Sequence, residues 1–109
     1  MPAYAIGCFD PIEMTPAIET YVRRIDETLA PFGGRFLIHG GRAIPLEGEW
    51  RKVLVVIEFP DRERAQAWYD SPVYRDILSL RTDTVTGEVV IIEGVPDGYR
   101  GSDLLKHGA

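Results

Sequence analysis

The residues best suited to chemistry are Arg35 and His39, which lie in one short segment, Arg35–His39, between two glycine pairs. Imidazole is the only side chain whose unperturbed pKa lies near neutrality, so His39 is the candidate acid or base. A guanidinium can hold a carboxylate or an enolate through parallel hydrogen bonds, which makes Arg35 the candidate clamp. Alternate residues of a strand share a face, so we expect both side chains to point the same way.

Both residues also have a structural interpretation. Glu58 is the charged residue within an apolar segment, and an ion pair with Arg35 would compensate the burial of its charge. A histidine at a strand end can equally be held by hydrogen bonds within the protein. A cavity beside His39, with Arg35 and a tyrosine converging on it, would favour an enzyme. A fully hydrogen-bonded His39 without a cavity would favour a non-catalytic module.

Aromatic residues form a second group of candidate ligand contacts. Trp68 and Tyr69 have the spacing of residues that pack a helix against a sheet. A buried tyrosine hydroxyl needs a hydrogen-bond partner, so Tyr69 or Tyr74 can face a cleft and donate to a ligand. Tyr4, in the first apolar segment, is a further candidate lining residue.

The sequence contains no metal or cofactor motif. The two histidines, His39 and His107, are far apart, and Cys8 is the single cysteine, so we predict no metal site and no disulfide. The first glycine pair precedes a strand rather than a helix, which is the wrong context for a phosphate cradle. We therefore predict no cofactor.

Composition excludes several classes of partner. The 109 residues carry a formal charge of −5, with 12 basic residues scattered among 17 acidic ones, which argues against nucleic-acid binding. No apolar run is long enough to span a membrane, and the chain has no secretory pattern at its start. We expect a cytoplasmic protein with one domain over residues 1–96 and a tail over residues 97–109.

Hydrophobic periodicity predicts a ferredoxin-like α+β fold. We expect strands over residues 3–9, 35–39, 53–59 and 88–93. We expect helices over residues 16–30 and 61–80. The second helix is broken at Ser71 and Pro72, and Val73, Ile77 and Leu80 face inward after the break. Residues 40–52 form a long loop or a hairpin arm. The order strand, helix, strand, strand, helix, strand predicts an antiparallel βαββαβ sheet with helices on one face.

Two of these strands, residues 53–59 and 88–93, are apolar on both faces. Helices on one side leave the second face uncovered, so another layer must cover it. A second copy of the chain is the simplest cover, and we predict a homodimer with the sheets face to face and the tail reaching toward the partner.

Three segments, residues 29–41, 56–61 and 67–74, resemble the bacterial family called domain of unknown function 1330, and the resemblance runs over about residues 2–96. That family belongs with the dimeric α+β barrels, the superfamily of antibiotic-biosynthesis monooxygenases, so the resemblance implies the same dimer. Its activity is unassigned. The resulting hypothesis is a protein that binds or converts a small organic molecule between sheet and helices. The alternative is a non-catalytic dimeric module for ligand binding or interaction.

Overall fold

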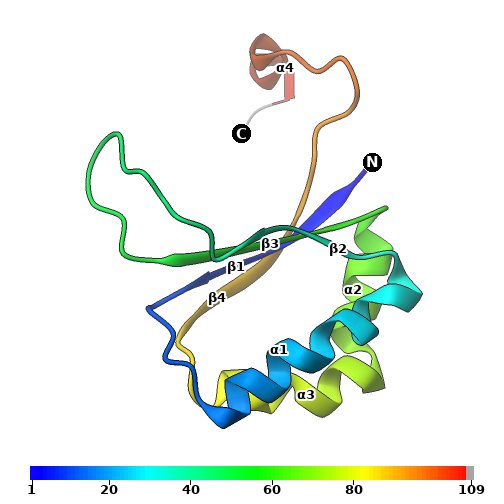
Figure 1. Ribbon diagram of the computed structural model, residues 1–109. Coiled ribbons are helices and arrows are strands. Elements are labelled where there is room, and N and C mark those ends of the chain that lie inside the picture. Colours follow the sequence, from blue (N-terminus) through cyan, green and yellow to red (C-terminus); the bar gives the residue numbers. More distant parts are fainter. Residues whose placement is uncertain (108–109) are drawn as a thin grey trace.

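Four antiparallel strands form one sheet in the computed structural model, which describes residues 1–107 (Figure 1). The strands are β1 (Ala3–Phe9), β2 (Arg35–His39), β3 (Val53–Phe59) and β4 (Gly87–Glu93). Their order is β2-β3-β1-β4, which places the two central strands, β3 and β1, next to each other. This is the ferredoxin-like α+β arrangement, and the predicted fold class is confirmed.

Three helices cover one face of the sheet: α1 (Pro16–Leu29), α2 (Arg62–Asp70) and α3 (Pro72–Thr82) (Figure 1). Helix α1 begins where Thr15 Oγ1 accepts a hydrogen bond from the Ile18 amide at 3.2 Å. It ends one residue earlier than predicted, because Ala30 starts the short helix η1 (Ala30–Phe32). The predicted break between α2 and α3 is confirmed, since the Ser71 hydroxyl accepts from the Tyr74 amide and caps α3.

The hydrophobic core lies between the sheet and these helices. On β1 the helix-facing residues are buried in strict alternation: Ala3, Ala5, Gly7 and Phe9. Phe59 of β3 and Trp68 of α2 pack against each other, with ring centroids 5.4 Å apart. The predicted inward face of α3 is partly wrong, because Val73 is exposed whereas Tyr74 is buried. Tyrosine removes more apolar area from water at that turn, which favours its burial over that of valine.

A β-bulge in β2 changes which face each of its residues occupies. Arg35 pairs with Glu58 and Phe36 with Ile57, but the next partner of Val56 is Ile38, so Leu37 is an extra residue. Arg35 therefore lies on the face away from the helices, whereas His39, opposite Val55, lies on the helix side. The prediction that Arg35 and His39 share a face is wrong, because the bulge interrupts the alternation on which it was based.

The second face of the sheet, which we call the open face, carries no helix (Figure 1). Its apolar side chains, Ile6, Ile38, Val56, Val90 and Ile92, are half-buried or exposed. Residues 40–52 form a loop without strand pairing. That loop and the C-terminal segment, with η2 (Gly101–Asp103) and α4 (Leu104–His107), both extend on the side of the open face. Within the described residues, no helix combines the length and the apolar character needed to cross a membrane.

Candidate functional site

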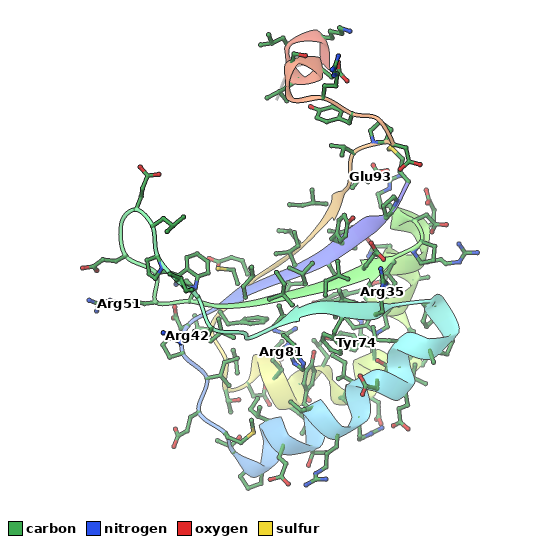
Figure 2. The ribbon with its side chains drawn as sticks, turned by 45° about the horizontal axis from the view of Figure 1, so that its top comes forward. Arg35, Arg42, Arg51, Tyr74, Arg81 and Glu93 are labelled. Carbon is green, nitrogen blue, oxygen red and sulfur yellow. The ribbon has the colours of Figure 1, made fainter. Side chains whose placement is uncertain are left out.

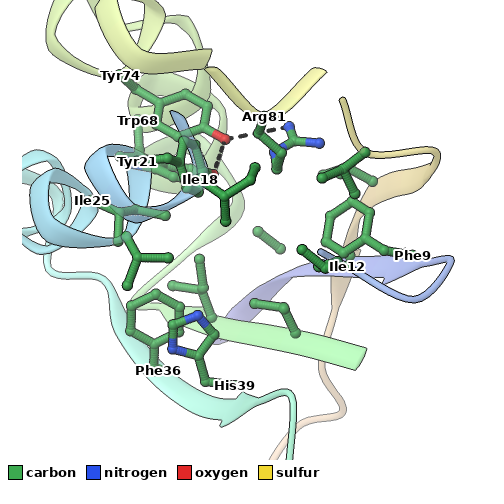
Figure 3. A pocket seen from close by; sticks show the side chains of 17 residues that line it. Phe9, Ile12, Ile18, Tyr21, Ile25, Phe36, His39, Trp68, Tyr74 and Arg81 are labelled. Carbon is green, nitrogen blue, oxygen red and sulfur yellow. Dashed lines mark hydrogen bonds between the residues drawn. The ribbon is translucent and has the colours of Figure 1, made fainter. Parts of the chain in front are cut away.

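A cavity of about 90 Å³ lies between the sheet and helices α1 and α3 (Figure 3). Small residues on β1 explain the space, since Ala5 and Gly7 fill little of the gap beneath the helices. The Phe9 ring lies over Gly7, where an added Cβ would come within 2.5 Å of it. The wall is otherwise mainly aliphatic and aromatic: Ile12, Ile18, Val22, Ile25, Phe36, Val55, Ile57, Trp68, Val85 and Val89.

Three polar side chains meet at one end of this cavity, Tyr21, Tyr74 and Arg81, and we call them the polar cluster (Figure 3). The hydroxyls of Tyr21 and Tyr74 are 2.6 Å apart and share a hydrogen bond. Arg81 Nη2 donates to the Tyr74 hydroxyl at 3.4 Å. Tyr74 and Arg81 are seven residues apart on α3, so two helical turns bring both side chains to the same face.

Arg81 is a buried cation, with 8% of its surface exposed. No carboxylate among the described side chains lies within 4.0 Å of its guanidinium. Besides its hydrogen bond to Tyr74, the guanidinium has aromatic neighbours: it lies 5.2 Å from the Phe9 ring centroid and 5.8 Å from that of Tyr21. Burial lowers the pKa of Arg81, but its contacts with Tyr74 and Tyr21 outweigh burial and the net direction is upward. The group therefore stays charged.

Tyr21 is held in its neutral form. Burial raises the pKa of its hydroxyl above the ordinary value of 10.0, and the neighbouring Tyr74 raises it further. Arg81 acts in the opposite direction but is a weaker influence. At neutral pH the polar cluster thus combines one fixed positive charge with a neutral hydroxyl on Tyr21.

We expect Tyr21→Phe to reduce the loss of stability at alkaline pH. Because the pKa of Tyr21 is raised in the folded state, its contribution is complete below the unfolded value of about 10 and declines as pH rises above it. One such group gives a slope of up to about 1.4 kcal/mol per pH unit. Urea unfolding at pH 8 and pH 11 checks this. Equal losses between the two pH values in the wild type and the variant would contradict it.

His39 lies across the cavity from the polar cluster (Figure 3). Its exposed imidazole stacks on the Phe36 ring, with centroids 4.2 Å apart and planes 9° apart. No hydrogen bond joins the imidazole to the described protein groups. The cavity beside His39 that the enzyme hypothesis requires is present, and Tyr21 and Tyr74 line the same cavity. The arginine that lines it is Arg81, not Arg35.

Three predicted site residues, Arg35, Glu58 and Tyr4, lie on the open face and not in this cavity. Arg35 Nε donates to Glu58 Oε1 at 2.8 Å, which is the ion pair expected under the structural interpretation. The pair is not buried, because 71% of the Arg35 side chain and 24% of the Glu58 side chain are exposed. Figure 2 shows Arg35 above the sheet, whereas Arg81 and Tyr74 lie between the sheet and the helices.

The aromatic candidates divide between the cavity and the outer surface. Trp68 lines the cavity and packs against Tyr74, with ring centroids 4.1 Å apart and planes tilted by 41°. Its Nε1–H donates to Thr28 Oγ1 at 3.0 Å. Tyr74 belongs to the polar cluster. Tyr69 is half-buried outside the cavity, with the Arg75 guanidinium 4.8 Å from its ring centroid. Of the predicted ligand contacts, only Trp68 and Tyr74 therefore join His39 at the cavity wall.

Sequence reasoning did not identify Tyr21 or Arg81 as site residues. Tyr21 is part of the apolar stripe of α1 and looks like an ordinary core residue. Arg81 follows Ile77 by four residues and Tyr74 by seven, so it continues a buried helical face. An arginine on such a buried helical face is the sequence feature from which this site residue could have been predicted. Among the described residues, no group of three or more His, Cys, Asp or Glu side chains could hold a metal.

Comparison with known proteins identifies a family and a fold. Residues 2–95 match the family model described as "Domain of unknown function (DUF1330)". No curated protein shows significant sequence similarity to the chain.

Several solved structures share the fold at low sequence identity. A protein of unknown function from Rhodopseudomonas palustris is 19% identical with a TM-score of 0.64, covering 87% of this chain and 83% of its own. SnoaB, a cofactor-independent oxygenase from Streptomyces nogalater, is 11% identical with a TM-score of 0.60, covering 91% and 98%. A dimeric ferredoxin-like protein of unknown function from Thermobifida fusca is 19% identical with a TM-score of 0.53, covering 84% and 88%.

Proposed function

This chain belongs to the domain of unknown function 1330 family, and on that premise we propose that it binds a small organic molecule in the cavity between its sheet and helices. The observation that carries the proposal is the cavity itself, with its apolar wall and its polar cluster at one end. Ligand sites in proteins combine these features: an apolar surround excludes water and a few polar groups fix the orientation of the ligand.

The open face supports a homodimer as the acting form. Apolar side chains from β2 and β4 are exposed there, those of Ile6 on β1 and Val56 on β3 are half-buried, and a large apolar patch of this kind marks a contact surface. Similar structures from Thermobifida fusca and Bacteroides fragilis are described as dimeric. Leu46 of the long loop and Leu105 of α4 are also exposed. Both segments extend on the side of this face, where they would contact the second copy.

His39 supports conversion of the ligand as a second candidate function. Its imidazole borders the cavity without a hydrogen bond to the described protein groups, so it is available to transfer a proton. The fold accommodates such chemistry without a cofactor, since SnoaB is a cofactor-independent oxygenase. The single cysteine, Cys8, is unpaired, in keeping with action in the reducing cytoplasm.

Filling the cavity is expected to abolish ligand binding. Val55→Phe places a ring in the cavity, whereas Val53→Phe makes the same change two residues away on the same strand face but outside the cavity wall. Neutral and anionic fragments are screened by methyl NMR. They have about four to eight non-hydrogen atoms, because the cavity is small and open on one side. Hits should shift the methyl signals of Ile18 and Ile25 in the wild type and in Val53→Phe, but not in Val55→Phe.

Two results would contradict the proposed function. One is the absence of any fragment that shifts these methyl signals in the wild type. The other is equal binding by the wild type and by a folded Val55→Phe variant, because that would place the ligand elsewhere. Circular dichroism of each variant establishes that it is folded.

A further inference from the structure

We propose that the polar end of the cavity is a carboxylate site, in which Arg81 holds the acid group of a short-chain organic acid and the Tyr21–Tyr74 pair donates a further hydrogen bond. The inference rests on the proposed function, because it names the ligand class for the same cavity. Arg35, the arginine expected to play this role, lies on the open face and is paired with Glu58.

Arg81 carries a buried charge that its contacts within the protein compensate only in part. A buried ion is stable only when it is paired or strongly hydrogen-bonded. Arg81 is 8% exposed, yet no acidic side chain among those described lies within 4.0 Å of it. The rings of Phe9 and Tyr21 compensate part of the charge. Contacts of this kind offset only part of the cost of burying an ion. An anion beside Arg81 would supply the remainder.

The side chains of the polar cluster have more hydrogen-bond donors than acceptors. A guanidinium offers five N–H donors, and Nη2 of Arg81 donates to the Tyr74 hydroxyl. When Tyr21 and Tyr74 share one hydrogen bond, the second hydroxyl hydrogen still needs an acceptor. Within the described residues, no side-chain nitrogen or oxygen sealed from solvent lacks a partner. The unused donors of Arg81 therefore face accessible space, where an acceptor-only group such as a carboxylate fits.

The volume of the cavity limits the size of the ligand. An engineered apolar cavity of about 150 Å³ binds benzene. By proportion, the cavity of about 90 Å³ encloses about four non-hydrogen atoms, enough for a carboxylate and the carbon that bears it. The wall is not closed, because the lining residues Val22, His39 and Val89 are exposed. A chain of a few further carbons can extend past them, so the ligand class is a short aliphatic acid.

Matched pairs of probes test the inference: propanoate, butanoate and pentanoate, each with its neutral amide. Dissociation constants are measured at pH 7 by NMR titration. We expect each acid to bind at least tenfold more tightly than its amide. Arg81→Met should reduce this preference to less than twofold, and Arg81→Lys should retain part of it. Arg75→Met is the matched control, because Arg75 lies on the same helix over the Tyr69 ring but outside the cavity.

The results that would overturn the carboxylate site differ from those that would overturn the proposed function. Equal binding of acids and amides by the wild type overturns the carboxylate site and leaves the proposed function standing. A tenfold preference that survives in Arg81→Met also overturns it. Failure of every probe and every neutral fragment to bind overturns both proposals. Should Arg81→Met not fold, the comparison of acids with amides in the wild type still decides, and Tyr74→Phe should weaken acid binding more than amide binding.

Discussion

Replacing Trp68 by alanine is expected to lower the free energy of unfolding by about 3–5 kcal/mol, a large fraction of the 5–15 kcal/mol typical of a domain. The Trp68 side chain contacts both the sheet and helices α1 and α3. Its ring lies 5.4 Å from that of Phe59 on β3 and 4.1 Å from that of Tyr74 on α3. Its indole N–H also donates to Thr28 on α1 at 3.0 Å. Truncation would enlarge the existing cavity and remove contacts with three elements at once.

Two control variants separate the causes of this loss. Trp68→Phe keeps most of the packing but removes the hydrogen bond to Thr28, and should cost about 1–2 kcal/mol. Trp50→Ala makes the same truncation at the second tryptophan, which is 43% exposed on the long loop whereas Trp68 is 3% exposed. Measured on a chain kept monomeric, so that the loop contacts no second copy, this truncation should change the free energy of unfolding by about 0.5 kcal/mol or less. Urea unfolding gives all three values. A loss of less than about 2 kcal/mol in Trp68→Ala would contradict the packing described.

The strands and helices could be predicted closely because their signals are local. The Thr15–Pro16 start of α1, the Ser71–Pro72 break and the apolar run of β3 each depend on residues adjacent in the chain. Predicted ends differ from the structure by one or two residues, as at Leu29 and Thr82. The order of these elements then limits the topology to few possibilities, and the ferredoxin-like sheet follows.

The candidate site could not be predicted equally well, because it depends on register between segments distant in sequence. An extra residue at Leu37 moves His39 to the helix side while Arg35 stays on the open face. Nothing in residues 35–39 distinguishes a bulged strand from a regular one, since the bulge is defined against β3. Arg81 was missed for a related reason. Its environment is supplied by Tyr21, 60 residues earlier in the chain, and by Phe9 on β1.

The proposed ligand site and the proposed dimer interface lie on opposite faces of the sheet. The helix side holds the cavity, and the open face holds an exposed ion pair, Arg35–Glu58, worth at most about 1 kcal/mol to stability. The apolar residues around that pair have no cover within the described chain. A second copy that covers them would approach from the side opposite the cavity wall formed by α1 and α3, so dimerisation and ligand binding can be tested by different substitutions.

Val90→Glu is expected to convert the proposed dimer into a monomer. Val90 lies on the open face opposite Ile6, near the middle of the edge strand β4. A carboxylate introduced there would be buried in the interface, and the twofold symmetry of a homodimer would bring in two such charges. An uncompensated buried charge costs about 3–5 kcal/mol. The dissociation constant of the dimer should therefore rise at least a hundredfold, since each 1.4 kcal/mol is tenfold.

Val73→Glu is the matched control for this substitution. Val73 is 49% exposed on α3 and Val90 is 47% exposed on β4, so the same change is made at equal exposure on opposite sides of the molecule. Sedimentation velocity at micromolar concentration should give a dimer for the wild type and Val73→Glu, and a monomer for Val90→Glu. A monomeric wild type would refute the dimer outright. A dimer that tolerates Val90→Glu but not Val73→Glu would instead place the interface on the helices, which would leave the apolar open face without an explanation.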